Sequence, residues 1–161
     1  MENIIKVGMA DMKAACHPAV LTTLGLGSCV GIALYDRSTC TIGLAHAMLP
    51  DSTQAMNLSN IAKFVDTSII ALIDEMVRLG ANRSKIVAKL AGGAQMFNFS
   101  QATDLMRIGF RNAVAAREKL EKLKIPIISE DTGGSYGRTI ELNSTNGALL
   151  IKTIGYGVKE I

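Results

Sequence analysis

Four short apolar runs, separated by Gly, Asp, Ser and Pro, occupy the first third of the chain. Runs of this length bounded by turn residues predict β-strands. They cover residues 4–7, 20–24, 29–35 and 41–49. A sheet is therefore expected to come first in the chain.

The apolar period changes at Leu58. From there to Leu79 apolar side chains recur every three or four residues, and Gly80 follows where a helix C′ residue would lie. This pattern predicts a long amphipathic helix. A second helix is predicted over residues 109–123, and Pro126 cannot continue it.

Further strands are predicted over residues 86–90, 125–129, 139–143 and 148–154. The last two flank Asn146-Gly147, a pair that suits a hairpin turn. Strands outnumber helices and neither alternate strictly with them nor segregate from them. The expected fold class is thus α/β of the α+β type, a single domain over residues 1–161 with mixed or antiparallel β layers and two main flanking helices.

Composition agrees with one soluble domain. A chain of 161 residues with 48% hydrophobic and 19% charged residues can bury a sizeable core. The net charge is only +3 and there is no tryptophan, so the sequence indicates neither a strongly basic surface nor aromatic side chains on which bases could stack. No nucleic acid is therefore expected as a partner.

The sequence also predicts where the protein acts. Residues 1–6 contain an early acid and no long apolar stretch, so they do not resemble a secretory signal. Charged side chains interrupt the apolar stretch of residues 58–79, which excludes a membrane span there; they are Lys63, Asp66, Asp74, Glu75 and Arg78. We therefore expect a cytoplasmic protein without membrane insertion.

Cysteine usage points to thiol chemistry or burial rather than to disulfides. The chain has three cysteines at irregular spacing, which argues against a disulfide framework in a reducing compartment. Cys29 opens an apolar run, and His46 lies in the next run. A cysteine needs a nearby base or cation to react as a thiolate near neutral pH, and His46 would raise the thiolate fraction of Cys29.

Hairpin geometry predicts that Cys29 and His46 meet. If residues 36–39 form a four-residue loop, Tyr35 faces Cys40 and counting back pairs Cys29 with His46. Directly opposite residues have β-carbons roughly 4.5 to 5.5 Å apart, within reach of a hydrogen bond. A slip of one residue would place the two side chains on opposite faces of the sheet.

The residues before Cys29 suit an acyl-transfer site. Gly25 and Gly27 allow positive φ and close approach of a substrate, and the N–H groups near Ser28 could stabilise an oxyanion. Thr23 offers a hydroxyl or carbonyl that could orient the imidazole.

Other interpretations of these residues stay open. Cysteine is among the most buried residue types, and a histidine in an apolar run is often a core residue, so Cys29 and His46 could simply pack. Zinc binding by the cysteines and histidines is disfavoured because no C-x-x-C pair exists. The glycine spacing from Gly25 to Gly31 does not fit a dinucleotide loop. Cys16 followed by His17 is a rival nucleophile, but neighbours in an extended chain point apart.

Several motifs together resemble those of the CheD family, the chemoreceptor glutamine deamidases of bacterial and archaeal chemotaxis. The resemblance covers nearly the whole chain and is specific because the motifs occur in order. They are residues 23–30, 46–52, 92–97, 108–112 and 131–134 with Arg138.

The resemblance implies an enzyme. Cys29 would be the nucleophile, His46 the general base and Thr23 the third member of the site, with Gly25, Gly27 and Ser28 in the oxyanion and substrate loop. The activity would be that of a cysteine-dependent protein-glutamine glutaminase, an amidohydrolase acting on linear amides. It would convert receptor glutamines to glutamates through a thioester and release ammonia, without metal or organic cofactor. The fold would resemble the deamidase domain of cytotoxic necrotizing factors.

The same resemblance implies partners. The substrates would be the cytoplasmic domains of chemoreceptors, and a CheC-type phosphatase would bind as a regulator. Phe97, Phe99 and Phe110 are candidate contact residues, although an aromatic beside a glycine-rich loop is often a core residue. A non-catalytic binding module for the phosphatase or receptor is the alternative function, and a cysteine protease or transglutaminase-like acyl transferase is a third.

Overall fold

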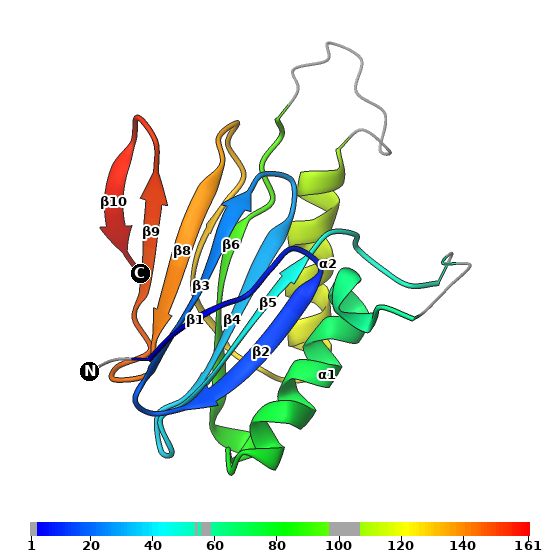
Figure 1. The fold of residues 1–161 in the computed structure, drawn as a ribbon. Coiled ribbons are helices and arrows are strands. Elements are labelled where there is room, and N and C mark those ends of the chain that lie inside the picture. Colours follow the sequence, from blue (N-terminus) through cyan, green and yellow to red (C-terminus); the bar gives the residue numbers. More distant parts are fainter. Residues whose placement is uncertain (1–2, 54, 56–58, 97–106) are drawn as a thin grey trace.

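The computed structural model describes residues 3–53, 55, 59–96 and 107–161. Over these residues the chain forms two five-stranded sheets and two α-helices, stacked in three layers (Figure 1). Both sheets mix parallel and antiparallel pairs, since β1 runs parallel to β3 and β6 parallel to β7. The predicted α+β class, with mixed β layers and two main helices, is confirmed.

The first sheet, which we call the outer sheet, has the strand order β1-β3-β8-β9-β10. Its strands are β1 Asn3–Lys6, β3 Ala19–Leu26, β8 Arg138–Asn143, β9 Leu149–Thr153 and β10 Gly157–Glu160. The second, the central sheet, has the order β2-β5-β4-β6-β7. Its strands are β2 Asp11–Cys16, β4 Val30–Asp36, β5 Thr41–Ala47, β6 Ile86–Gly92 and β7 Ile127–Thr132.

Both helices cover the face of the central sheet that is turned away from the outer sheet (Figure 1). They are α1, Val65–Arg78, and α2, Ile108–Lys122, and the short 3₁₀ turns η1, Ile61–Lys63, and η2, Arg83–Lys85, flank α1. No helix in the described part of the chain is long and apolar enough to cross a membrane.

Two apolar cores lie on the two faces of the central sheet. Val30, Ile32 and Leu34 of β4 pack toward the helices, whereas Ala33 and Tyr35 pack toward the outer sheet. A strand buried on both faces is apolar at successive positions rather than at alternate ones. This explains why residues 30–35 form a continuous apolar run.

The sequence patterns did not predict two of the strands, and they predicted the wrong first residue for one helix. β2 begins at Asp11 and carries Lys13, and all four residues of β10 are exposed, so neither has a strong apolar pattern. The first helix begins at Val65 rather than at Leu58, which lies outside the described residues, because Phe64 is extended with φ −106° and ψ 137°.

The predicted hairpin register was wrong by two residues. The loop is formed by residues 37–40, so Tyr35 pairs with Ile42 and Gly31 pairs with His46. The carboxylate of Asp36 explains this, because it accepts hydrogen bonds from the backbone N–H and hydroxyl of Ser38 and so holds Asp36 in the strand. A shift of two residues keeps every side chain on its face.

The helix core gives a stability prediction. Leu72 of α1 is fully buried, whereas Ile70 on the same helix is 43% exposed. We expect Leu72→Ala to lower the free energy of unfolding by about 2–5 kcal/mol, because it removes buried apolar area and leaves a cavity. Ile70→Ala is the matched control and should lose much less. Urea unfolding measures both, and equal losses would contradict the described packing of α1.

Candidate active site

The candidate residues meet where the chain passes from one sheet to the other. Thr23 lies on β3 of the outer sheet, and His46 lies on β5 of the central sheet. Cys29 lies in the short connection between β3 and β4, which carries the chain across. The site is therefore enclosed between the two sheets, and all three side chains are buried, with exposed fractions of 1%, 1% and 7% for Thr23, His46 and Cys29.

A hydrogen bond between the sheets fixes the imidazole of His46. The Nδ1 atom lies 2.7 Å from the hydroxyl oxygen of Thr23. That hydroxyl donates its single hydrogen to the backbone carbonyl of Val7, also at 2.7 Å. Because the hydroxyl has no second hydrogen, it accepts at His46, and Nδ1 must carry the proton. Thr23 thereby selects one tautomer of the ring.

The other ring nitrogen is free to act as a base. Nε2 of His46 is buried and has no hydrogen-bond partner in the described part of the chain. Burial lowers the pKa of His46, so the ring is neutral near neutral pH. The site thus holds an unprotonated, unpartnered nitrogen, which can accept a proton from a thiol.

Cys29 is a neutral thiol in the resting site. Burial raises its pKa, and its own backbone N–H lowers it to a smaller extent. The expected rise in thiolate fraction caused by His46 is therefore not found. No hydrogen bond joins the Cys29 thiol to His46 Nε2 within the described residues. Two neutral groups suit proton transfer during attack rather than a preformed ion pair.

Cys29 and His46 share the face of the central sheet that meets the outer sheet. Cys29 packs in the core between the sheets with Ile42 and Leu44, and His46 follows these residues on the same face of β5. Gly31 lies opposite His46, and the side chains of Ile140 and Leu26 fill the space beside it, at 2.7 Å and 3.1 Å from where a Cβ would lie. The shared face is confirmed, although the direct pairing of Cys29 with His46 is not.

The carbonyl groups around Cys29 are all tied to neighbouring segments. Gly93 N–H donates to the carbonyl of Cys29 at 2.8 Å, and Ala94 N–H donates to that of Gly27 at 2.9 Å. The side-chain amide of Asn112 donates to the carbonyl of Ser28 at 2.9 Å. The backbone N–H of Ser28 donates to no acceptor within the described residues, and that of Cys29 faces only its own sulfur. These two donors can stabilise an oxyanion.

The two glycines of the connection have different uses. Gly25 has φ 68° at the point where the pairing of β3 with β8 shifts register, so a positive φ is required there. Gly27 has no positive φ, contrary to its predicted use. A Cβ at Gly27 would lie 3.3 Å from the side chain of Met96, so the glycine makes room for Met96.

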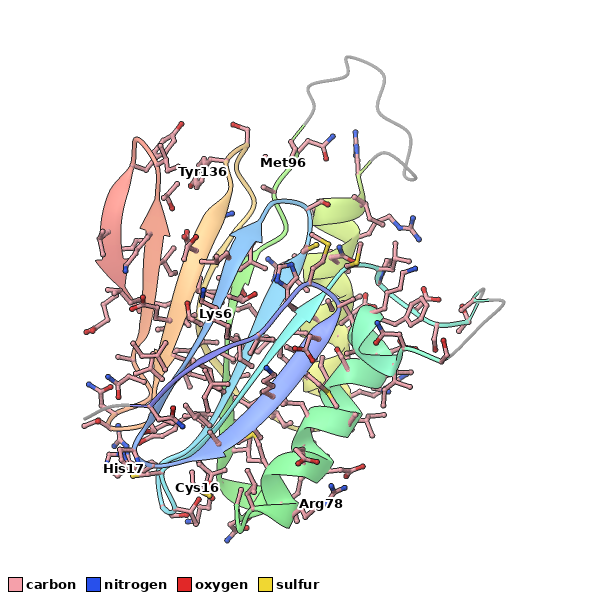
Figure 2. The ribbon with its side chains drawn as sticks, in the orientation of Figure 1. Lys6, Cys16, His17, Arg78, Met96 and Tyr136 are labelled. Carbon is pink, nitrogen blue, oxygen red and sulfur yellow. The ribbon has the colours of Figure 1, made fainter. Side chains whose placement is uncertain are left out.

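Exposed apolar side chains lie near the end of β3 and in the segment after β6. Leu24 is 59% exposed and Met96, labelled in Figure 2, is 45% exposed. A pocket of about 200 Å³ opens beside Thr23 and is lined by Met9 and Leu24 among others. Of the three candidate residues, only Thr23 lines this pocket.

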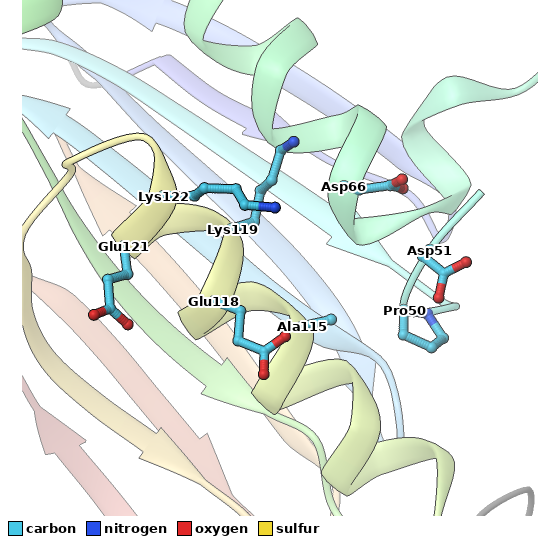
Figure 3. A pocket seen from close by; sticks show the side chains of 8 residues that line it. All are labelled: Pro50, Asp51, Asp66, Ala115, Glu118, Lys119, Glu121 and Lys122. Atoms are coloured by element: carbon cyan, nitrogen blue, oxygen red, sulfur yellow. The ribbon is translucent and has the colours of Figure 1, made fainter. Parts of the chain in front are cut away.

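A second, larger hollow lies away from the three candidate residues. It is an open groove of about 590 Å³ between the segment after β5 and the two helices (Figure 3). Carboxylates and ammonium groups line it together, from Asp51, Asp66, Glu118, Lys119, Glu121 and Lys122. Neither Cys29 nor His46 lines this groove, so it is not the reaction site.

The rival thiols lie at the far end of the central sheet. Cys16 ends β2 and pairs with Thr41 at the start of β5, whereas His46 is near the end of that strand. Figure 2 shows Cys16 and His17 together at the end opposite Met96. Their side chains point to different partners, the carbonyl of Leu79 and the hydroxyl of Ser144. No group of metal-ligating side chains gathers within the described residues.

The predicted contact residues are only partly described. Phe97 and Phe99 lie outside the described residues. Phe110, in the first turn of α2, is 60% exposed and is not a core residue.

Sequence reasoning assigned no role to Asn112 or Gly93. Both belong to motifs of the family resemblance, but nothing in their spacing shows that they contact the carbonyls beside Cys29. These contacts depend on how α2 and β6 pack in three dimensions.

Known proteins similar to this chain share one description. A family model for CheD chemotactic sensory transduction matches residues 48–153. A probable chemoreceptor glutamine deamidase CheD from Caldanaerobacter subterraneus subsp. tengcongensis is 56% identical over 99% of this chain and 98% of its own length. A protein of the same description from Lachnoclostridium phytofermentans is 55% identical over 100% of both chains. The family model begins after His46, and the full-length relatives extend the match across the candidate site.

Solved structures resemble the fold more distantly. A Neisseria meningitidis protein of the DUF152 family has a TM-score of 0.52 at 8% identity, over 83% of this chain and 65% of that one. The hypothetical protein YfiH from Bacillus licheniformis has a TM-score of 0.48 at 17% identity, over 76% of this chain and 50% of that one. This chain thus spans one half to two thirds of those proteins. The likeness to cytotoxic necrotizing factors stays a prediction.

The buried neutral imidazole predicts a pH dependence of stability. Because burial lowers the pKa of His46, the unfolded chain binds the proton first as the pH falls below about 6.5. The free energy of unfolding should therefore decrease from pH 7.5 to about 5.5, and it should decrease less in His46→Gln. Urea unfolding across this range measures both slopes. His17→Gln, which retains His46, is the control, and equal slopes in wild type and His46→Gln would contradict a buried neutral ring.

Proposed function

Since this chain belongs to the CheD family of chemotactic sensory transduction proteins, we propose that it is a cysteine-dependent protein-glutamine deamidase of chemoreceptors. One deamidase domain spans residues 1–161 and acts in the cytoplasm on the receptors' cytoplasmic domains. The observation that carries this proposal is the hydrogen bond between His46 Nδ1 and the Thr23 hydroxyl, which leaves Nε2 without a partner among the described residues, on the sheet face that also carries the buried Cys29.

The first half-reaction forms a thioester. Nε2 of His46 takes the proton of the Cys29 thiol as the sulfur attacks the carbon of the glutamine carboxamide. The carbonyl oxygen becomes an oxyanion, which the N–H groups of Ser28 and Cys29 stabilise. When the intermediate collapses, the carbon–nitrogen bond breaks and the proton on Nε2 passes to the leaving ammonia.

The second half-reaction releases glutamate. A water molecule gives a proton to Nε2 as its oxygen attacks the thioester carbon. The carbon–sulfur bond then breaks, and the proton returns from Nε2 to the sulfur of Cys29. Thiol and imidazole supply the whole chemistry, so the reaction uses no metal or organic cofactor. Thr23 holds the ring in the tautomer that both steps need.

Burial of the thiol favours a long, flexible substrate side chain. Cys29 is only 7% exposed, so a backbone amide of a folded substrate would not reach it easily. A glutamine carboxamide at the end of a flexible side chain is better able to reach a buried thiol than a backbone amide is. This supports deamidation over the third candidate, cleavage of a peptide bond.

A regulatory partner belongs to the same proposal. A CheC-type phosphatase binds this protein, and Phe110 is the described candidate for that contact because it is 60% exposed on the first turn of α2. Phe97 and Phe99 are further candidates by sequence. The alternative, a non-catalytic binding module, retains this contact but needs no free Nε2.

Deamidation of a receptor fragment tests the proposal. Wild-type protein should convert specific glutamines to glutamates, and Cys29→Ala should abolish this because it removes the nucleophile. His46→Ala should lower kcat by roughly 10²–10⁴-fold, the usual worth of a general base. Mass spectrometry of peptides from the fragment measures the product. Cys16→Ala, at the far end of the sheet, is the matched control.

Unchanged glutamines after wild-type treatment of several receptor fragments would favour the binding module. Cleaved or amine-tagged peptides would instead indicate a protease or an acyl transferase.

A further inference from the structure

A buried side chain on α2 joins the two segments that carry the candidate nucleophile and base. Asn112 is fully buried, and its amide nitrogen donates to the backbone carbonyls of Ser28 and Met48, each at 2.9 Å. Ser28 precedes Cys29 directly, and Met48 follows His46 by two residues. One amide group therefore spans from the connection between β3 and β4 to the end of β5.

The chemistry of the amide fixes its orientation. An amide nitrogen has two hydrogens and both acceptors are carbonyl oxygens, so the nitrogen must face them and the side-chain oxygen must face away. That oxygen is buried and has no partner within the described residues. An unsatisfied buried oxygen costs about as much as hydrogen bonds return, so the amide adds little to stability. A role in stability alone does not account for it.

The backbone that carries Asn112 is held firmly against the same site. Gly109, at the start of α2, packs closely against the segment that follows β6. A Cβ on Gly109 would lie 2.1 Å from the carbonyl oxygen of Ala94. Ala94 and Gly93 in turn donate to the carbonyls of Gly27 and Cys29. The start of α2 and the Cys29 connection therefore form one packed unit.

We propose that Asn112 is a positioning residue that sets the separation of the Cys29 sulfur and Nε2 of His46. This inference rests on the proposed function. Replacing the amide would release the carbonyls of Ser28 and Met48 and let the two segments move apart. A misplacement of about 1 Å at reacting groups can cost on the order of 10²-fold in rate, without weakening substrate binding.

Asn112→Leu tests this inference, because leucine has a similar size and lacks both donors. We expect kcat for glutamine deamidation to fall about 10–100-fold while KM changes less than about twofold. Asn112→Ser, with a single donor, should also have a kcat below that of wild type and serves if the leucine variant folds poorly.

Ser144→Ala is the matched control. The Ser144 hydroxyl is fully buried and also joins two segments, accepting from Ala19 N–H and contacting His17 Nδ1, each at 2.9 Å. It lies beside the start of β3, whereas Thr23 and Cys29 lie toward and beyond its end. We expect at most a small fall in Tm in both variants, and an unchanged kcat in Ser144→Ala.

A second readout does not depend on any substrate. The rate at which iodoacetamide alkylates Cys29 is measured by peptide mass spectrometry in wild type, Asn112→Leu, His46→Ala and the double variant. His46 can accept the thiol proton during alkylation although Cys29 is neutral at rest. If Asn112 holds the two groups together, His46→Ala should lower the rate in wild type but have little further effect in Asn112→Leu.

Additive effects in this cycle, a wild-type kcat in Asn112→Leu, or an equal loss of kcat in Ser144→Ala would each overturn the positioning role. None of these three results would contradict the proposed deamidase function, because wild type would still deamidate the receptor fragment. Deamidation that persists in Cys29→Ala would instead overturn the proposed function.

Discussion

The site depends on one hydrogen bond between two sheets. Thr23 on the outer sheet accepts from Nδ1 of His46 on the central sheet, and its own hydrogen goes to the carbonyl of Val7. This arrangement decides which ring nitrogen is bare, and burial then keeps the ring neutral. Without the second sheet the imidazole would have neither its partner nor its dry surroundings. The layered fold is therefore a requirement of the chemistry.

The neutral resting state has a consequence for specificity. Burial raises the pKa of Cys29, so the thiol is less reactive toward small electrophiles than a thiolate stabilised by a charged partner. The proposed reaction needs a carboxamide placed between the sulfur and the N–H groups of Ser28 and Cys29, so that the proton can move to His46 as the bond forms. A buried, neutral thiol of this kind is protected until a substrate side chain enters.

Sequence patterns predicted most strands and proposed the candidate site residues, but they did not predict the contacts that hold these residues in place. Alternation and turn residues were sufficient for the hairpin from β4 to β5. The shared face of Cys29 and His46 was predicted by counting back from the expected loop, and it survived because the error in register was two residues. The register was wrong because the Asp36 carboxylate bonds to Ser38 and moves the loop by one residue, which spacing does not reveal. The role of Asn112 required the packing of α2, a long-range contact without a local signal.

Measuring the tautomer of His46 tests most directly whether Thr23 leaves a free base for Cys29. Nitrogen NMR of the protein labelled with ¹⁵N at its two histidines reports the protonation of each ring nitrogen. At pH 7 we expect His46 to be neutral, with hydrogen on Nδ1 and none on Nε2, and Thr23→Val to remove this preference. A ring that carries its hydrogen on Nε2, or on both nitrogens, would contradict the account, because no free base would then be available to Cys29.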